Sequence, residues 1–195
     1  DYESKLVYYT GVDFAISQKE RADYTVIATV GITTTGEMLV VDIRRGRWDS
    51  QDIISEMFSV QRRYKPDLFI TETGSIEKSL GPFLRKQMQE RGLYLNLYPM
   101  QPTKDKLSRA RGIQARMRAG GIRFDKEASW YLSLEDEMAR FPKDRHDDQV
   151  DALSWIGLVL DKIVEAPTQQ EEDDEEYNNQ YSQFLLTGRN GTTGY

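Results

Sequence analysis

Hydrophobic and polar positions along this chain predict strands first and helices later. Apolar, β-branched runs over residues 6–15, 24–32 and 38–43 predict three strands with short connections, as in an antiparallel meander. Residues 67–72 (DLFITE) and 93–100 predict two further strands, and residues 122–124 predict a short extended segment. A sheet that begins with three antiparallel strands is therefore expected.

Apolar residues at helical spacing predict five helices between and after these strands. The predicted helices cover residues 49–64, 78–91, 105–118, 130–141 and 147–163. Asp49 or Ser50 is the expected N-cap of the first helix, and Gly92 marks the end of the second. The order of elements predicts an α/β fold, in which helices flank a mixed sheet.

Composition excludes several classes of site. The chain has 195 residues, no cysteine, one histidine and a formal net charge of −6. Disulfides, thiolate zinc sites, cysteine nucleophiles and multi-histidine metal sites are thereby excluded. The sequence has no apolar run of the roughly 18–20 residues that a membrane-spanning helix needs, so no membrane partner is expected.

The net charge is confined to the end of the chain. Residues 165–195 contain seven acids and a single base, Arg189, and so carry the whole charge of −6, which leaves residues 1–164 neutral. Because that stretch is otherwise rich in Gln, Asn, Thr, Ser and Gly, we predict one folded domain over 1–164 and a disordered acidic tail over 165–195.

Charge is also segregated within the neutral part. Residues 99–126 hold eight bases against two acids, a local charge of +6, whereas residues 135–151 are rich in acids. A basic segment of this kind suits contacts with the phosphates of a nucleic acid.

Two predicted strands carry an acid where an apolar residue is expected. Asp13 lies inside the most hydrophobic strand, and Glu72 ends DLFITE just before a glycine turn. A buried carboxylate must be paired, protonated or bound to metal. A salt bridge with a buried arginine, or a turn at the strand end, is the alternative for Asp13.

A third acidic element opens the last predicted helix, in RHDDQVDAL. Asp148 and Asp151 are three residues apart and Asp147 and Asp151 four apart, so their carboxylates share one helix face. Acids that favour the positive end of the helix dipole are the alternative explanation. It accounts for Asp147 or Asp148, but poorly for Asp151, which lies one turn later on the expected buried side.

Clustered carboxylates stay ionised together when cations neutralise them. Oxygen-only ligands suit Mg²⁺ or Mn²⁺ rather than zinc. Four carboxylates on three elements can hold two such ions about 3.5–4 Å apart, an arrangement that supports phosphodiester hydrolysis by an activated water.

These motifs, in their order and spacing, resemble a known family. The segments VYYTGVDFA, ADYTVIATVG, LFITETG, TKDKLSRARGIQARMRAGGIRF and RHDDQVDALSW resemble the nuclease domain of bacteriophage terminase large subunits. That family belongs to the RNase H-like superfamily and is most similar to RuvC-type resolvases. The resemblance covers residues 6–163.

The resemblance implies a site and an activity. The sheet would have three antiparallel strands followed by two parallel ones, with the first and fourth strands as neighbours. This brings Asp13 beside Glu72, while the last helix adds Asp148 and Asp151. Asp13 would bridge two metal ions and Glu72 would hold one. Asp147 is the alternative ligand in the last helix. Members of the family cut double-stranded DNA concatemers during genome packaging, in the cytoplasm of the infected bacterium.

The resemblance also implies partners. Lys104, Lys106 and Arg109 would grip the DNA backbone near the scissile phosphate, a solvated helix face being the alternative. The family places an ATPase motor before the nuclease, but this sequence contains no G-x-x-x-x-G-K-[ST] loop. We therefore expect an excised, monomeric domain without motor activity, whose full-length protein works with a portal and a small terminase subunit. The roles of His146 and Asp23 stay open.

Other functions remain as alternatives. Within the nuclease class these are a RuvC-like junction resolvase and a transposase-like strand transferase. A non-catalytic packaging-motor assembly module, with the acids holding a structural ion, is the alternative outside it. An actin-like ATPase needs glycine-rich phosphate hairpins, and Gly11 alone stands near the right place.

Overall fold

A computed structural model describes residues 6–15, 24–101, 105–143 and 147–165. The chain divides into two compact units, Asp1–Val159 and Leu160–Tyr195. All contacts reported below lie within the first unit. The predicted acidic tail lies, after residue 165, outside the described residues.

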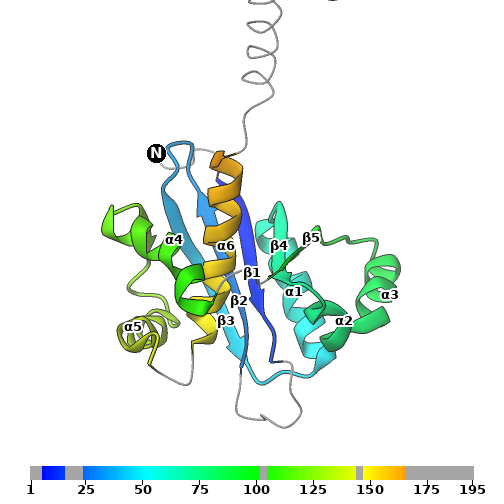
Figure 1. The fold of residues 1–195 in the computed structure, drawn as a ribbon. Helices are drawn as coiled ribbons and strands as arrows, with labels where there is room; N and C mark the ends of the chain where they lie inside the picture. Colours follow the sequence, from blue (N-terminus) through cyan, green and yellow to red (C-terminus); the bar gives the residue numbers. More distant parts are fainter. Residues whose placement is uncertain (1–5, 16–23, 102–104, 144–146, 166–195) are drawn as a thin grey trace, which may run out of the picture. The chain divides into compact units, whose positions relative to one another are not determined.

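The described residues form six strands and six helices (Figure 1). The strands are β1 (Val7–Asp13), β2 (Thr25–Ile32), β3 (Met38–Gly46), β4 (Leu68–Glu72), β5 (Leu97–Met100) and β6 (Ile122–Phe124). The helices are α1 (Ser50–Tyr64), α2 (Ser75–Ser79), α3 (Gly81–Arg91), α4 (Lys106–Arg118), α5 (Tyr131–Arg140) and α6 (Asp148–Glu165).

The strands make one mixed sheet in the order β5-β4-β1-β2-β3-β6. β1, β2 and β3 pair antiparallel, and β4 and β5 continue the sheet in parallel beyond β1. The predicted sheet of three antiparallel and two parallel strands is therefore confirmed, as is the adjacency of the first and fourth strands. The short extended segment predicted over 122–124 is β6, and the structure adds that it pairs parallel to β3 at the opposite edge of the sheet.

Two predicted elements have different bounds. The helix predicted over 78–91 is wrong as one helix: α2 ends at Ser79 and α3 begins at Gly81, which has a φ of 50°. The following residue, Pro82, lacks an N–H and cannot continue a preceding helix. The strand predicted over 93–100 is reduced to Leu97–Met100, the four residues that pair with β4.

The two faces of β1 have different neighbours. Val12 and Phe14 belong to the buried apolar core that β1 forms with α1 and α3. Gly11 and Asp13 point to the opposite face, because side chains alternate along a strand. α6 lies across that second face, with α4 beside it (Figure 1).

Candidate active site

Asp13 and Glu72 end two neighbouring parallel strands. The register of β1 and β4 runs to Val12 opposite Thr71, and Asp13 and Glu72 are the next residue of each strand. Paired residues of parallel strands share a face, so both acids belong to the face that carries α6. The two predicted site residues therefore lie at the same, C-terminal end of these adjacent strands.

Gly11 lets α6 approach β1 closely. A Cβ at this position would overlap the backbone carbonyl of Ala152, and it would lie 3.1 Å from Cγ1 of Ile156. The backbone of α6 therefore rests directly on β1, two residues before Asp13. A side chain at residue 11 would push the acidic turn of α6 away from that aspartate.

The N-terminal turn of α6 buries two of its three acids. Asp147 is 8% exposed and Asp151 is 4% exposed, while Asp148 is half-buried. The N–H of Asp151 donates to the carbonyl of Asp147 at 2.8 Å, which places both residues on one turn. The expected burial of Asp151 is confirmed, and the burial of Asp147 exceeds what a surface acid at a helix end requires.

The electrostatics of Asp13 record how these acids converge. Burial raises the pKa of Asp13 well above its usual value, and the carboxylates of Asp151, Asp148 and Asp147 raise it further. The ammonium of Lys106 acts in the opposite direction on the same pKa. Like charges a few ångströms apart disfavour ionisation, so the four aspartates form one anionic cluster around the end of β1.

Two cations from α4 enter this cluster. Asp105 caps α4 by accepting the N–H of Ser108 at 3.0 Å, and Lys106 is the first residue of the helix. The Nζ of Lys106 lies 2.7 Å from Oδ1 of Asp147 and 2.9 Å from Oδ2 of Asp151. Burial lowers the pKa of Lys106, but these hydrogen bonds outweigh it and the net shift is upward.

Arg109 lies one turn further along α4 and is buried. Its Nη2 is 3.3 Å from Oδ1 of Asp151, and its guanidinium stacks 5.0 Å from the ring centre of Trp155. Arg109 therefore forms part of the wall of the cluster. DNA binding by Lys106 and Arg109 stays a prediction, and Lys104 lies outside the described residues, as do His146 and Asp23.

Asp148 also lies near a cation of β3, and Glu72 lies beside a cavity. Oδ2 of Asp148 is 4.0 Å from Nη2 of Arg45 on β3. Glu72 is half-buried and lines a cavity of about 520 Å³ between β4, β5 and the α2–α3 pair. The Oγ of Ser75 donates to the carbonyl of Glu72, which fixes the turn after β4.

The donor set suits a hard cation. Within the part of the chain that the structure describes, no group of three or more His, Cys, Asp or Glu side chains is already arranged to hold a metal ion. Asp147 and Asp151 instead share Lys106. All the candidate donors are carboxylate oxygens. Burial raises the pKa of Asp13 most and the neighbouring carboxylates raise it further, and a bound cation would favour their ionised forms. The oxygen donors present therefore suit a hard divalent cation.

The fold and these motifs match a known family. The model of the terminase RNaseH-like domain matches residues 10–158. The chain belongs to this family. No curated protein matches the sequence.

Solved structures of phage terminases share the fold. This terminase RNase H-like domain is similar to the large terminase nuclease from the thermophilic phage G20c with bound magnesium, with a TM-score of 0.57 and 16% identity over 80% of this chain and 83% of that one. The same nuclease with bound cobalt gives 0.59 and 17% over the same shares. The large terminase from a second thermophilic bacteriophage gives 0.53 and 13% over 77% of this chain and 38% of that one. The RNase H-like fold predicted from the sequence is confirmed.

Two residues near the candidate active site were not predicted from the sequence. Glu137 is buried on α5 and binds the N-terminal turn of α6, and Arg45 on β3 lies near Asp148. A signal for Glu137 exists in the sequence, because it lies between Leu134 and Met138 on an apolar helix stripe. Like Asp13 in its strand, Glu137 is an acid at a position where the pattern predicts a buried apolar residue.

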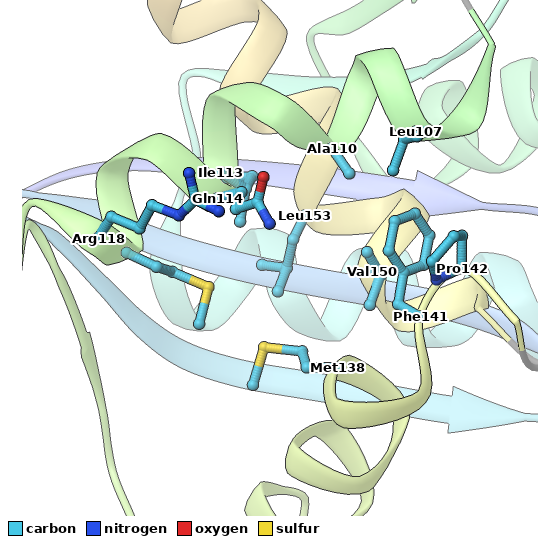
Figure 2. Close-up of a pocket in the computed structure, with 11 residues that line it drawn as sticks. Leu107, Ala110, Ile113, Gln114, Arg118, Met138, Phe141, Pro142, Val150 and Leu153 are labelled. Atoms are coloured by element: carbon cyan, nitrogen blue, oxygen red, sulfur yellow. The ribbon is translucent and has the colours of Figure 1, made fainter.

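An apolar pocket of about 480 Å³ adjoins the other side of the α6 N-terminus (Figure 2). Val150 and Leu153 of α6 face it, together with Phe141 and Pro142 after α5. Arg118 is its one charged lining residue, and none of the predicted carboxylates lines it. The pocket therefore lies beside the candidate active site and is separate from it.

Proposed function

We propose that this chain is a metal-dependent endonuclease that cuts double-stranded, concatemeric viral DNA during genome packaging, as the nuclease domain of a phage terminase large subunit. The observation that carries the proposal is the position of Asp13 at the end of β1, among the carboxylates of Asp147, Asp148 and Asp151. Desolvated like charges destabilise a fold. Bound cations would neutralise these carboxylates, which is why the arrangement favours a cation-binding site.

Asp13, Glu72, Asp148 and Asp151 would hold two Mg²⁺ or Mn²⁺ ions, with Asp147 as the alternative ligand on α6. Structures of the G20c nuclease with bound magnesium, zinc or cobalt support a divalent cofactor. When bound, the ions would supply Lewis acidity and a water of lowered pKa for phosphodiester hydrolysis.

The chain's own residues would bind and orient the DNA. α4 begins in the acidic cluster at Lys106 and carries exposed cations, Arg111 and Arg118, further along. A duplex whose backbone follows α4 would place a phosphate at the cluster, and contacts of this kind fix position without reading sequence. Cleavage with low sequence specificity follows from that arrangement.

The proposed partners follow from the family. The protein would act on double-stranded DNA in the cytoplasm of the infected bacterium, with a portal and a small terminase subunit in the full-length assembly. The domain alone would be monomeric. In the part of the chain that the structure describes, no helix has the length and hydropathy needed to cross a membrane.

Cleavage of plasmid DNA tests the proposal. The wild-type chain should nick and linearise plasmid with Mn²⁺ or Mg²⁺, and Asp13→Ala should abolish this. Asp67→Ala is the matched control, because Asp67 is an exposed acid just before β4. Retained Mn²⁺-dependent cleavage by D13A would overturn the assignment.

The same assay separates the alternative functions. Preference for four-way junctions over linear duplex would replace the packaging substrate with a junction and favour a resolvase. Metal binding without cleavage of any DNA would favour an assembly module in which the acids hold a structural ion.

A further inference from the structure

The N-terminus of α6 is capped from another helix. The carbonyl of Asp147 accepts the first helical hydrogen bond, from the N–H of Asp151, so Asp147 is the N-cap residue. An aspartate at this position ordinarily accepts the N–H groups of the second and third helical residues, which here are Gln149 and Val150. Its Oδ1 instead lies 2.7 Å from Nζ of Lys106, inside the acidic cluster.

Glu137 on α5 takes the place of that local cap. Its Oε1 accepts the N–H of Gln149 at 2.7 Å and the N–H of Val150 at 2.9 Å. Its Oε2 accepts Nε2 of Gln149 at 2.7 Å. Glu137 is 5% exposed, so α5 delivers a buried carboxylate to the positive end of the α6 dipole.

The same wall holds a second acid of the site. Gln149, which is buried, also donates to Oγ of Ser133 at 3.2 Å, and Arg45 donates to that hydroxyl at 3.2 Å. The guanidinium of Arg45 lies 4.0 Å from Asp148 at its other nitrogen. α5, β3 and the first turn of α6 are thus joined by polar contacts that end at the acidic cluster.

We propose that Glu137 is a positioning residue for the nuclease site: by capping α6 from α5, it leaves the carboxylate of Asp147 turned toward Lys106 and Asp13. Without Glu137, two buried N–H groups lose their acceptor, and the nearest replacement is the side chain of Asp147 itself. Asp147 would then leave the cluster and cap its own helix. The metal-binding consequence rests on the proposed function, whereas the capping consequence does not.

A double-mutant cycle in thermal unfolding, measured with EDTA, tests the capping step. In the wild-type chain Asp147→Ala removes the contact with Lys106 but no helix cap, and its effect on the melting temperature is the reference value. In the Glu137→Ala background the same substitution should cost a further 2–4 °C or so, about the value of one helix cap in a chain of this size. Additive effects of the two substitutions would overturn the proposal.

Mn²⁺ affinity, measured by calorimetry on the full chain, tests the link to the site. E137A should weaken binding about ten-fold, as loss of a group that orients a metal ligand does. Glu137→Gln keeps an amide oxygen for both N–H groups and should stay within about three-fold of wild type. Asp136→Ala is the charge-matched control on the exposed side of α5 and should bind as wild type does.

The outcomes separate the two proposals. Equal Mn²⁺ affinity of E137A and wild type would overturn the positioning role. Absence of Mn²⁺ binding by the wild-type chain would contradict the proposed function, and the unfolding cycle would still decide the capping role. If E137A does not fold, Glu137→Asp, whose carboxylate is one methylene too short to reach α6, replaces it in both measurements.

Discussion

At the scale of single residues, the site is built from groups that oppose folding. Asp13 lies among three other aspartates, and both burial and their charges raise its pKa. Lys106 and Arg109 offset part of this repulsion from α4. Active sites commonly store such unfavourable electrostatics, which are relieved when a ligand binds.

Asp13→Asn should therefore stabilise the chain while it abolishes cleavage. In EDTA near neutral pH, removal of one charge from the cluster should raise the melting temperature by about 2–4 °C, equivalent to about 1 kcal/mol in a chain of this size. Asp67→Asn, on an exposed acid, should leave it unchanged. A melting temperature lowered by D13N would show that the ionised Asp13 is satisfied as it stands.

Asp148 and Asp147 should differ in importance. The charge of Asp148 has a larger effect on the pKa of Asp13 than that of Asp147, which is neutralised by Lys106 at 2.7 Å. Asp148→Asn should lower the rate of plasmid cleavage roughly 100-fold, the scale for loss of one charge-stabilising group, and Asp147→Asn should lower it less. The reverse order would make Asp147 the metal ligand in place of Asp148.

At the scale of elements, the site depends on how closely α6 approaches β1. Gly11 is the residue of β1 under Ala152, and no other amino acid fits there without moving the helix. On the other side of α6, Gly157 brings α4 close, because a Cβ at that position would lie 3.0 Å from the side chain of Ile113. Gly11 thus sets the distance between the acids of β1 and α6, and Gly157 sets the distance between α6 and α4.

Gly11→Ala should damage both stability and metal binding. Overpacking against a backbone carbonyl should cost roughly 1–3 kcal/mol in the free energy of unfolding, measured with urea. Mn²⁺ affinity should fall as well, because α6 carries Asp148 and Asp151 away from Asp13. Gly121→Ala is the control, since its Cβ would lie at an ordinary 3.4 Å from the carbonyl of Arg116. Unchanged Mn²⁺ affinity in G11A would contradict this account of the site.

Two elements differ from what the local sequence predicts. Apolar spacing predicts one helix over 78–91, but the Gly81-Pro82 pair inside it divides α2 from α3. The strand over 93–100 is shortened because β4 offers it only four paired residues. The extended segment predicted over 122–124 is confirmed as β6, but three residues give no periodic signal from which its pairing with β3 could be predicted.

At the scale of the whole molecule, charge is separated by position in the chain. The formal net charge of −6 belongs to residues 165–195, and residues 99–126 carry +6. Two of those cations, Lys106 and Arg109, contact the acidic cluster, and Arg123 pairs with Glu37 at 3.2 Å. The exposed Arg111 and Arg118 are the stronger candidates for contact with DNA.

Charge reversal of Arg111 and Arg118 to Glu should weaken duplex binding equally for all sequences. The slope of log affinity against log salt should become shallower by about one for each phosphate that the chain no longer neutralises, as measured by fluorescence anisotropy at several salt concentrations. Arg62→Glu with Arg63→Glu on α1 is the matched control, because α1 packs on the opposite face of the sheet. An equal decrease in affinity for both pairs would indicate a non-specific effect of net charge.

Hydrophobic periodicity predicts most of the strands and helices and the mixed sheet, and the unusual acids are visible in the sequence itself. Strand and helix periodicity follow from local packing, and an acid such as Asp13 in an apolar strand is conspicuous in any sequence. The cationic partners of these acids and the cap of α6 are seen only in the folded structure. Lys106 on α4 binds the carboxylate of Asp147, which lies 41 residues later in the sequence, and Glu137 on α5 caps α6. These contacts form because α4 and α5 pack against α6, and a local sequence pattern does not show which helices pack together.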